Sequence, residues 1–251
     1  MKTEIEELAN YIRMANNILV FTGAGVSTGS GISDFRGPNG VWKRRQPVYY
    51  DDFMSKEEAR LEHWDQKLEA WPSFLNAKPT ESHIAAVMLE KAGKLEVLVT
   101  QNIDGLHSAA GTSSSKLVEI HGTNTQIECQ QCRKRCDPAP IFQKYANCRK
   151  VPLCSCGGLL KPATISFGQG LHSEDIAKAE AGAESADLVV ALGSTLGVYP
   201  AAGIPLMAAQ RGIPYVVINL GATDQDNVDN LTLRIEEDVQ AVFPAAVAMA
   251  L

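Results

Sequence analysis

Short apolar runs alternate with longer stretches of mixed polarity along most of the chain. An apolar run of four to six residues with polar or glycine flanks is typical of a buried strand. Where apolar side chains return every three or four positions, as at Ile5, Leu8 and Ile12 within residues 4–15, the pattern predicts an amphipathic helix. The runs that predict strands are Ile18–Phe21, Leu95–Val99, Leu117–Ile120, Leu188–Leu192 and Tyr215–Leu220.

Helical stretches lie between these runs. Residues 51–75 are expected to be helical in pieces, and Pro79 is expected to open a helix that runs toward Lys91 and ends at Gly93. Further helices are expected at residues 175–184 and from about residue 237 onward. Strands that alternate with helices predict an α/β fold, with a doubly wound parallel sheet covered by helices on both faces.

Five residues follow directly, or almost directly, after predicted strands. Because the carboxyl ends of parallel strands meet at one edge of a sheet, and ligands bind there, these residues are expected to share one site. They are Gly23, Gln101, His121, Gly193 and Asn219.

The stretch GAGVSTGSGISDFRG, Gly23 to Gly37, follows the first strand. Glycines let backbone N–H groups approach a phosphate, so the loop predicts phosphate binding at the start of a helix. Gly23-x-Gly25 opens the dinucleotide fingerprint, but Thr28 follows where its third glycine belongs, and Lys43-Arg44-Arg45 stands where a dehydrogenase has an acid. The loop therefore does not favour an ordinary dehydrogenase. A tight turn without a ligand is the alternative.

Composition narrows the class of protein further. Of 251 residues, 45% are hydrophobic, and no apolar run approaches the length of a membrane span. The first residues, MKTEIEELANYIRMANN, lack the features of a secretory signal, so a cytoplasmic protein is expected. A net charge of −6 argues against specific nucleic-acid binding as the main function.

All six cysteines lie between Cys129 and Cys156. Two close pairs, Cys129-x-x-Cys132 and Cys154-x-Cys156, are typical of a four-thiolate zinc site, which has no position left for water and is therefore structural. The polar residues between the pairs offer little apolar surface, so a metal would supply folding energy. A redox dithiol pair or two disulfides are alternatives, and Cys136 or Cys148 could replace a ligand.

Several longer motifs, in the same order as in the sirtuins, carry a resemblance over nearly the whole chain. The glycine loop is similar to the family's GAGxSxxSGIPDFR signature, with Ser33 where proline is usual. TQNIDGLH, from Thr100, matches TQNxDxLH, and His121-Gly122 matches the catalytic HG pair. GSTLGVYPA, from Gly193, resembles GTSLxVxPA, and VINLG resembles the strand on the adenosine side. The sirtuins are NAD-dependent protein lysine deacylases.

The resemblance implies one catalytic unit over residues 1–251. Its larger part would be a Rossmann-like NAD-binding domain made of residues 1–122 and 160–251. Residues 123–159 would form an inserted zinc-binding module. The implied zinc ligands are Cys129, Cys132, Cys154 and Cys156.

The resemblance also implies a role for each site residue. His121 would take a proton from a ribose hydroxyl, while Asn102 and Asp104 orient the nicotinamide ribose and carboxamide. Gly193, Ser194, Thr195 and Asn219 would hold the adenosine half. The full set implied for NAD is Gly23, Ala24, Gly25, Ser27, Asp34, Phe35, Arg36, Gln101, Asn102, Ile103, Asp104, Gly193, Ser194, Thr195, Asn219, Leu220 and Val239.

The substrate implied is an acyl-lysine protein or peptide, and the products are free lysine, nicotinamide and O-acyl-ADP-ribose. Ile165–Gln169 resembles the family's peptide-pairing segment, with Gln169 in place of glutamate. Sirtuins that prefer succinyl or malonyl lysine carry a Tyr-x-x-Arg pair that the matching residues 64–68 lack, so acetyl-lysine is the expected substrate. The alternatives are ADP-ribosyl transfer or NAD hydrolysis on the same fold, and NAD binding without turnover.

Overall fold

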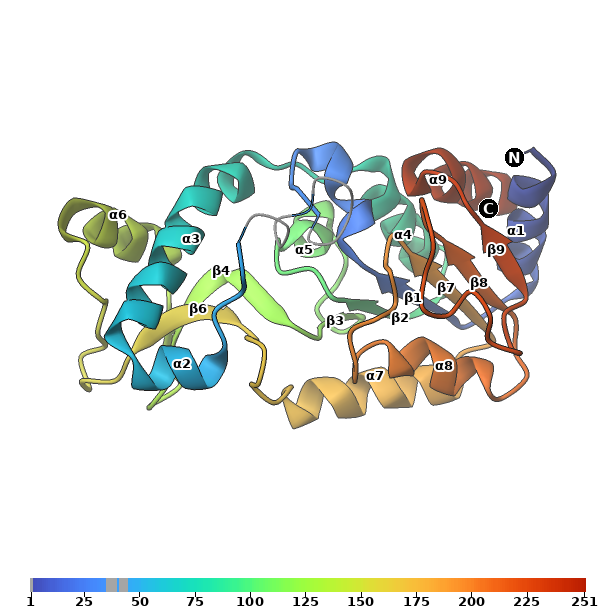
Figure 1. The fold of residues 1–251 in the computed structure, drawn as a ribbon. Coiled ribbons are helices and arrows are strands. Elements are labelled where there is room, and N and C mark those ends of the chain that lie inside the picture. Colours follow the sequence, from blue (N-terminus) through green and yellow to red (C-terminus); the bar gives the residue numbers. More distant parts are fainter. Residues whose placement is uncertain (1, 35–39, 41–44) are drawn as a thin grey trace.

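The computed structural model of the chain describes residues 2–34, 40 and 45–251. Phe35 and Arg36, both predicted to bind NAD, lie outside the described residues. The larger sheet has six parallel strands in the order β3-β2-β1-β7-β8-β9 (Figure 1). These strands are β1 (Ile18–Thr22), β2 (Leu95–Thr100), β3 (Leu117–Glu119), β7 (Leu188–Leu192), β8 (Tyr215–Ile218) and β9 (Leu233–Ile235). The predicted doubly wound α/β fold is confirmed.

Helices cover both faces of this sheet. Helices α1 (Lys2–Met14), α4 (Glu81–Lys91) and α9 (Val239–Ala250) lie on one face, and α7 (Ser173–Ser185) and α8 (Gly203–Ala209) lie on the other (Figure 1). Side chains alternate along β1, so that Val20 packs on the face covered by α1, α4 and α9, and Phe21 packs on the face covered by α7 and α8. Among the described residues, no helix is long and apolar enough to cross a membrane.

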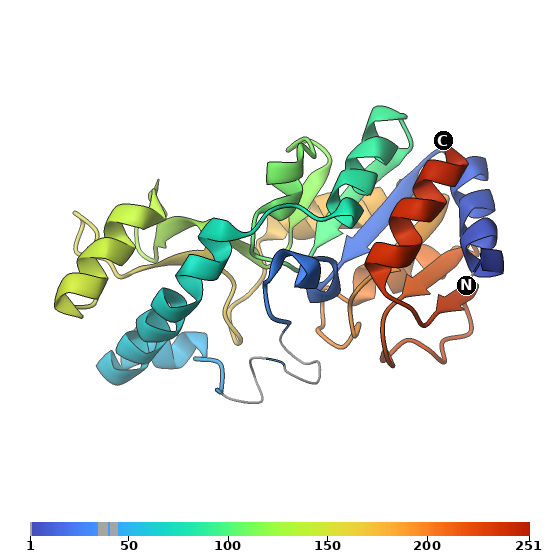
Figure 2. The same ribbon diagram turned by 90° about the horizontal axis from the view of Figure 1, so that it is seen from above.

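A smaller antiparallel sheet lies beside the larger one, with strand order β5-β4-β6. Its strands are β4 (Gly122–Cys129), β5 (Arg135–Cys136) and β6 (Leu160–Thr164). Helices α2 (Tyr50–Ser55), α3 (Glu57–Asn76) and α6 (Pro138–Cys148) surround it (Figures 1 and 2). The structure thus places β6 in this second sheet, although the sequence analysis assigned residues from 160 onward to the larger part.

The residues between the cysteine pairs contribute more to packing than the sequence analysis expected. Phe142 stacks on Trp71 with ring centroids 4.4 Å apart, and Tyr145 lies against Trp64 at 5.6 Å. The Tyr145 hydroxyl donates to Asp65 Oδ1 at 2.7 Å. The expectation that this segment lacks a core was wrong because its aromatic residues pack on α3, which is distant in sequence.

The glycine loop also differs from expectation. Instead of one helix after Gly23, the described part of the loop forms two 3₁₀ turns, η1 (Ala24–Val26) and η2 (Thr28–Ser30). Glycine, serine and threonine are weak α-helix formers, and each turn is only three residues long. The described part of the loop therefore lacks the dipole of a long helix.

Candidate active site

The predicted site residues converge at the carboxyl edge of the larger sheet. Gly23 follows β1, Gln101 follows β2, Gly193 follows β7 and Asn219 follows β8. His121 lies two residues beyond the end of β3 and directly precedes β4. Because these strands run parallel, the five residues lie at one edge of the sheet, while their sharing one site stays a prediction.

Two loops meet very closely at this edge. The Gly23 N–H donates to Leu192 O at 2.9 Å, and the Gly25 N–H donates to Gly193 O at 2.8 Å. A Cβ atom on Gly25 would lie 2.6 Å from Gly193 Cα, and Gly193 itself has φ of +59°. Larger residues would push the loops after β1 and β7 apart. Gly23 and Gly25 are therefore required for these two loops to pack, apart from any role in phosphate binding.

Ser27, Asn102 and Asp104 form a polar cluster beside the glycine loop, in which Ser27 and Asn102 are buried and Asp104 is half-buried. The Asn102 Nδ2 donates to Gly23 O at 3.0 Å and to Ser27 Oγ at 3.1 Å. Ser27 Oγ in turn donates to Asp104 Oδ2 at 2.7 Å, and the Leu106 N–H donates to Asp104 Oδ1. Burial raises the pKa of Asp104, and the hydrogen bonds from Leu106 and Ser27 oppose that rise.

A narrow cavity lies next to this cluster. Ala24, Ser27, Asn102, Ile103 and Asp104 line it, so it brings together residues from two predicted motifs. Phe74 of α3 also lines the cavity, together with Ile32 and Ser33. Sequence reasoning missed Phe74, because nothing in the local pattern distinguishes it from other apolar residues of α3.

The position of His121 is set by its backbone neighbours and by its ring. Gly122 turns the chain with φ of +73°, and a Cβ atom there would lie 2.1 Å from Ala163 O. His121 Nδ1 lies 3.1 Å from Gln101 O. A carbonyl only accepts, so Nδ1 carries the proton and the lone pair of the neutral ring lies on Nε2. The Gln101 side chain points elsewhere, donating to Ser194 Oγ at 2.7 Å.

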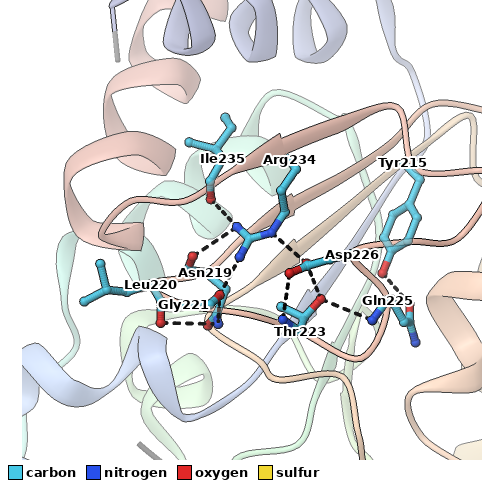
Figure 3. Close-up of polar contacts among 9 residues, drawn as sticks. All are labelled: Tyr215, Asn219, Leu220, Gly221, Thr223, Gln225, Asp226, Arg234 and Ile235. Atoms are coloured by element: carbon cyan, nitrogen blue, oxygen red, sulfur yellow. Dashed lines mark hydrogen bonds and ion pairs between the residues drawn. The ribbon is translucent and has the colours of Figure 1, made fainter. Parts of the chain in front are cut away.

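On the adenosine side of the predicted site, Arg234 holds the turn after β8 (Figure 3). Its guanidinium donates to the carbonyl groups of Asn219, Gly221 and Ile235. Its Nε donates to Asp226 Oδ1 at 2.7 Å, and Asp226 also accepts from Thr223. Sequence reasoning missed Arg234, since a single arginine in a short edge strand gives no signal of its own.

The remaining predicted residues lie around this edge with different exposures. Leu220 is 75% exposed, Val239 is buried at the first position of α9, and Asp34 is half-buried. The Thr195 carbonyl accepts from the Asp224 N–H at 2.9 Å. The Asn219 Nδ2 donates to Gly221 O at 3.0 Å, so this side chain also shapes the turn.

The four predicted zinc ligands form one cluster. Their sulfur atoms all lie within 4.8 Å of one another, with Cys129 and Cys156 at 3.5 Å and Cys132 and Cys154 at 3.8 Å. A disulfide needs about 2.05 Å, so these pairs are not bonded. Four thiolates around zinc at about 2.3 Å would lie about 3.8 Å apart, which fits this cluster. Cys136 and Cys148 are not members of it.

Comparison with known proteins identifies the family. The Sir2 family model matches residues 23–200. An NAD-dependent protein deacetylase of Rhodopseudomonas palustris is 39% identical over 235 residues, which cover 93% of each chain. One of Sulfolobus acidocaldarius is 36% identical over 98% of this chain and 94% of its own. The chain therefore belongs to the Sir2 family, the sirtuins.

Solved structures agree with this assignment. A Sir2 variant with deacetylated p53 peptide and 3′-O-acetyl ADP-ribose matches with a TM-score of 0.87, at 33% identity over 98% of both chains. A Sir2 protein bound to a propionylated peptide matches with a TM-score of 0.84, at 33% identity over 96% of this chain and 95% of the other.

Proposed function

We infer that this chain is an NAD-dependent protein lysine deacetylase that acts in the cytoplasm. The observation that carries the inference is the juxtaposition of His121, oriented by Gln101 O, with the Ser27–Asn102–Asp104 cluster at one sheet edge. Family membership and the deacetylase names of the relatives support it. We assign no specific nucleic acid and no membrane as a partner.

The residues of the edge fit the parts of NAD. We place the pyrophosphate beside the glycine loop, and the adenosine half beside the Asn219–Gly221 turn with Ser194 and Thr195. We assign nicotinamide to the side of Ile103, with Asn102 and Asp104 as the neighbouring polar residues. The other residues that we assign to NAD binding are Gln101, Asp34, Leu220, Val239, Phe35 and Arg36.

NAD supplies the ribose that accepts the acyl group, so that nicotinamide, free lysine and O-acyl-ADP-ribose are the products. His121 takes the proton of a ribose hydroxyl at Nε2, the nitrogen that the Gln101 carbonyl leaves unprotonated. Asp104 and Asn102 orient the sugar and the carboxamide, and Asn102 is buried. Ile103 lines the nicotinamide side.

The acyl-lysine peptide is assigned to the segment beside His121. The Ile165 N–H donates to His121 O at 2.8 Å, so Ile165–Gln169 begins next to the proposed base. An extended peptide would pair there, with Gly193–Tyr199 on its other side. The preference for neutral acyl groups rests on the missing Tyr-x-x-Arg pair in residues 64–68, where Lys67 donates to Asn124 Oδ1 at 3.2 Å.

We assign zinc to Cys129, Cys132, Cys154 and Cys156. Four thiolates would leave no open coordination position, so the metal would hold the second sheet and take no part in the reaction. Cys129 ends β4 and Cys132 lies in the turn that leads to β5, so the metal would fasten this hairpin to residues 154–156.

The proposed reaction is tested with acetyl- and succinyl-lysine forms of one peptide, with and without NAD. We expect deacetylation only with NAD, acetyl recovered on ADP-ribose, and slower removal of succinyl. Transfer of label from the ADP-ribose of NAD to protein would instead favour an ADP-ribosyltransferase. Faster removal of succinyl would overturn the acyl preference alone.

A further inference from the structure

Helix α4 presents an exposed stripe that lies outside the residues assigned to the reaction. Ile84 is 40% exposed and Met88 is 38% exposed, and both lie in the middle of the helix. Glu81 and Lys91, at its two ends, are exposed as well. These four positions are spaced by three, four and three residues, which is the spacing of the seam through which helices pair in coiled coils. The stripe therefore has the pattern of a helix-pairing surface.

The neighbouring helix α9 adds further apolar residues to this side of the molecule. Helix α4 lies between α9 and α5 (Leu106–Ala110) (Figure 2). No residue of α9 is charged, and its exposed positions are Ala241, Ala245, Ala248 and Met249. A surface helix of a globular protein normally carries charged or polar side chains on its outer side. Two adjacent helices thus present apolar side chains to solvent.

The charges at the two ends of the stripe show which partner fits it. Glu81 and Lys91 make no ion pair with any residue that the structure describes. Each charge complements the dipole of α4, but the dipole does not account for the apolar side chains between them. Glu81 and Lys91 lie five residues on either side of Ala86, and Ile84 and Met88 lie two residues on either side of it. A copy of the same stripe in antiparallel orientation is therefore complementary to it at every position.

We propose that α4 forms the centre of a dimer interface, in which two copies of the chain pair their α4 helices antiparallel about a two-fold axis near Ala86. Such an axis makes each contact occur twice. Glu81 then lies beside Lys91 of the second copy, and Ile84 packs on Met88 of the second copy. Exposed ion pairs contribute little affinity, so the charges fix the orientation and the apolar side chains supply most of the binding. With few apolar side chains in contact, the dimer is weak, with a Kd in the micromolar range.

The first test is sedimentation velocity of the purified full chain between about 1 and 300 µM, a range that spans a micromolar Kd. We expect a monomer–dimer equilibrium, which Met88→Glu weakens at least about 10-fold because a carboxylate enters the apolar contact. The matched control is Met54→Glu, since Met54 is 39% exposed but lies in α2, beside the second sheet. Thermal melting checks that both variants fold. A monomer at every concentration, or equal effects of the two variants, would overturn the proposal.

The second test reverses the charges of the stripe. Glu81→Lys leaves it with two cations, and Lys91→Glu leaves it with two anions. Each variant alone should dimerise roughly 10-fold more weakly than the wild type, because like charges meet in both contacts. An equimolar mixture of the two variants should associate as the wild type does, and so should the double variant Glu81→Lys/Lys91→Glu. The control is Glu180→Lys, at an exposed position of α7 on the opposite face of the larger sheet, which should leave the Kd unchanged.

A mixture that associates no better than its components would overturn the antiparallel pairing, and so would a double variant as weak as the single variants. The proposal goes beyond the proposed function and does not depend on it, since Glu81, Ile84, Met88 and Lys91 are not assigned to the reaction. If the chain failed to deacetylate a peptide, the proposed function would fail, whereas the Kd of the dimer would still decide for or against this interface.

Discussion

At the scale of single residues, the hydrogen bonds that a side chain already makes decide which of its atoms can take part in the reaction. His121 lies at a strand end, as do many unremarkable histidines, and its position alone does not make it a base. The bond from Nδ1 to Gln101 O assigns the tautomer and leaves the basic nitrogen as Nε2. The orientation of the Asn102 side-chain amide is fixed in the same way, because its Nδ2 donates to Gly23 O and to Ser27 Oγ.

Arg234 provides a prediction at this scale. Its guanidinium orders the turn that we assign to adenosine, so Arg234→Met should raise the KM for NAD roughly 10-fold and leave kcat nearly unchanged. The measurement is steady-state kinetics with NAD varied at saturating peptide. The matched control is Arg211→Met, because Arg211 also donates to two carbonyl groups, those of Ala183 and Ala186, before the start of β7 and far from the site. Equal effects of the two variants would contradict the assignment.

At the scale of elements, β6 carries an unusual buried cation. Lys161 is 0% exposed, and its amine donates to the carbonyl groups of Pro162 and Thr164. Burial, together with the charge of the nearby Lys67, lowers its pKa from 10.5 to about 7. Above that pKa the folded chain has released a proton that the unfolded chain still holds. The free energy of unfolding should therefore rise with pH from about 7 toward 10.5 through this group.

This pH dependence can be measured by urea unfolding between pH 7 and 9. Lys161→Met should reduce the rise in unfolding free energy by up to about 1.4 kcal/mol per pH unit, since the variant has no proton to release there. Lys144→Met, at a lysine on the exposed side of α6, is the control and should keep the wild-type slope. A slope unchanged by Lys161→Met would contradict a neutral, buried amine.

The elements also show what the sequence could and could not predict. The strands of the larger sheet up to β8 are mainly apolar runs, so β1, β2, β3, β7 and β8 were predicted to within a residue or two at each end. Strand β9 and the second sheet were missed, because their strands are short or polar and pair with partners far away in sequence. The motif residues at strand ends were predictable, whereas Phe74 and Arg234 reach the site only through tertiary packing.

At the scale of the whole molecule, one strand connects the proposed reaction site with the proposed metal. His121 directly precedes β4, and Cys129 is the last residue of that strand. Eight strand residues span about 25 Å, so the metal would act on the reaction only through the fold. The division of the chain into two domains stays a prediction that this arrangement makes reasonable.

Removing the metal should destabilise the second sheet first. A strong chelator, or Cys132→Ser, should lower the melting temperature and shift the emission of Trp64 and Trp71, which pack on α6, to longer wavelength. Fluorescence and metal content measured on the same sample check this. Cys148→Ser is the matched control, since its exposed sulfur donates to Lys144 O and lies outside the cluster. Metal-free protein with unchanged melting and emission would contradict the structural role.

The measurement that tests the central claim most directly is a pair of assays on His121→Ala, using the purified full chain. One assay follows deacetylation of an acetyl-lysine peptide with NAD, and the other measures the Kd for NAD. We predict that turnover falls at least about 100-fold while the Kd stays within a few-fold of wild type, because a general base contributes mainly to the chemical step. Turnover that survives the loss of this imidazole, or a loss explained entirely by weaker NAD binding, would contradict the account.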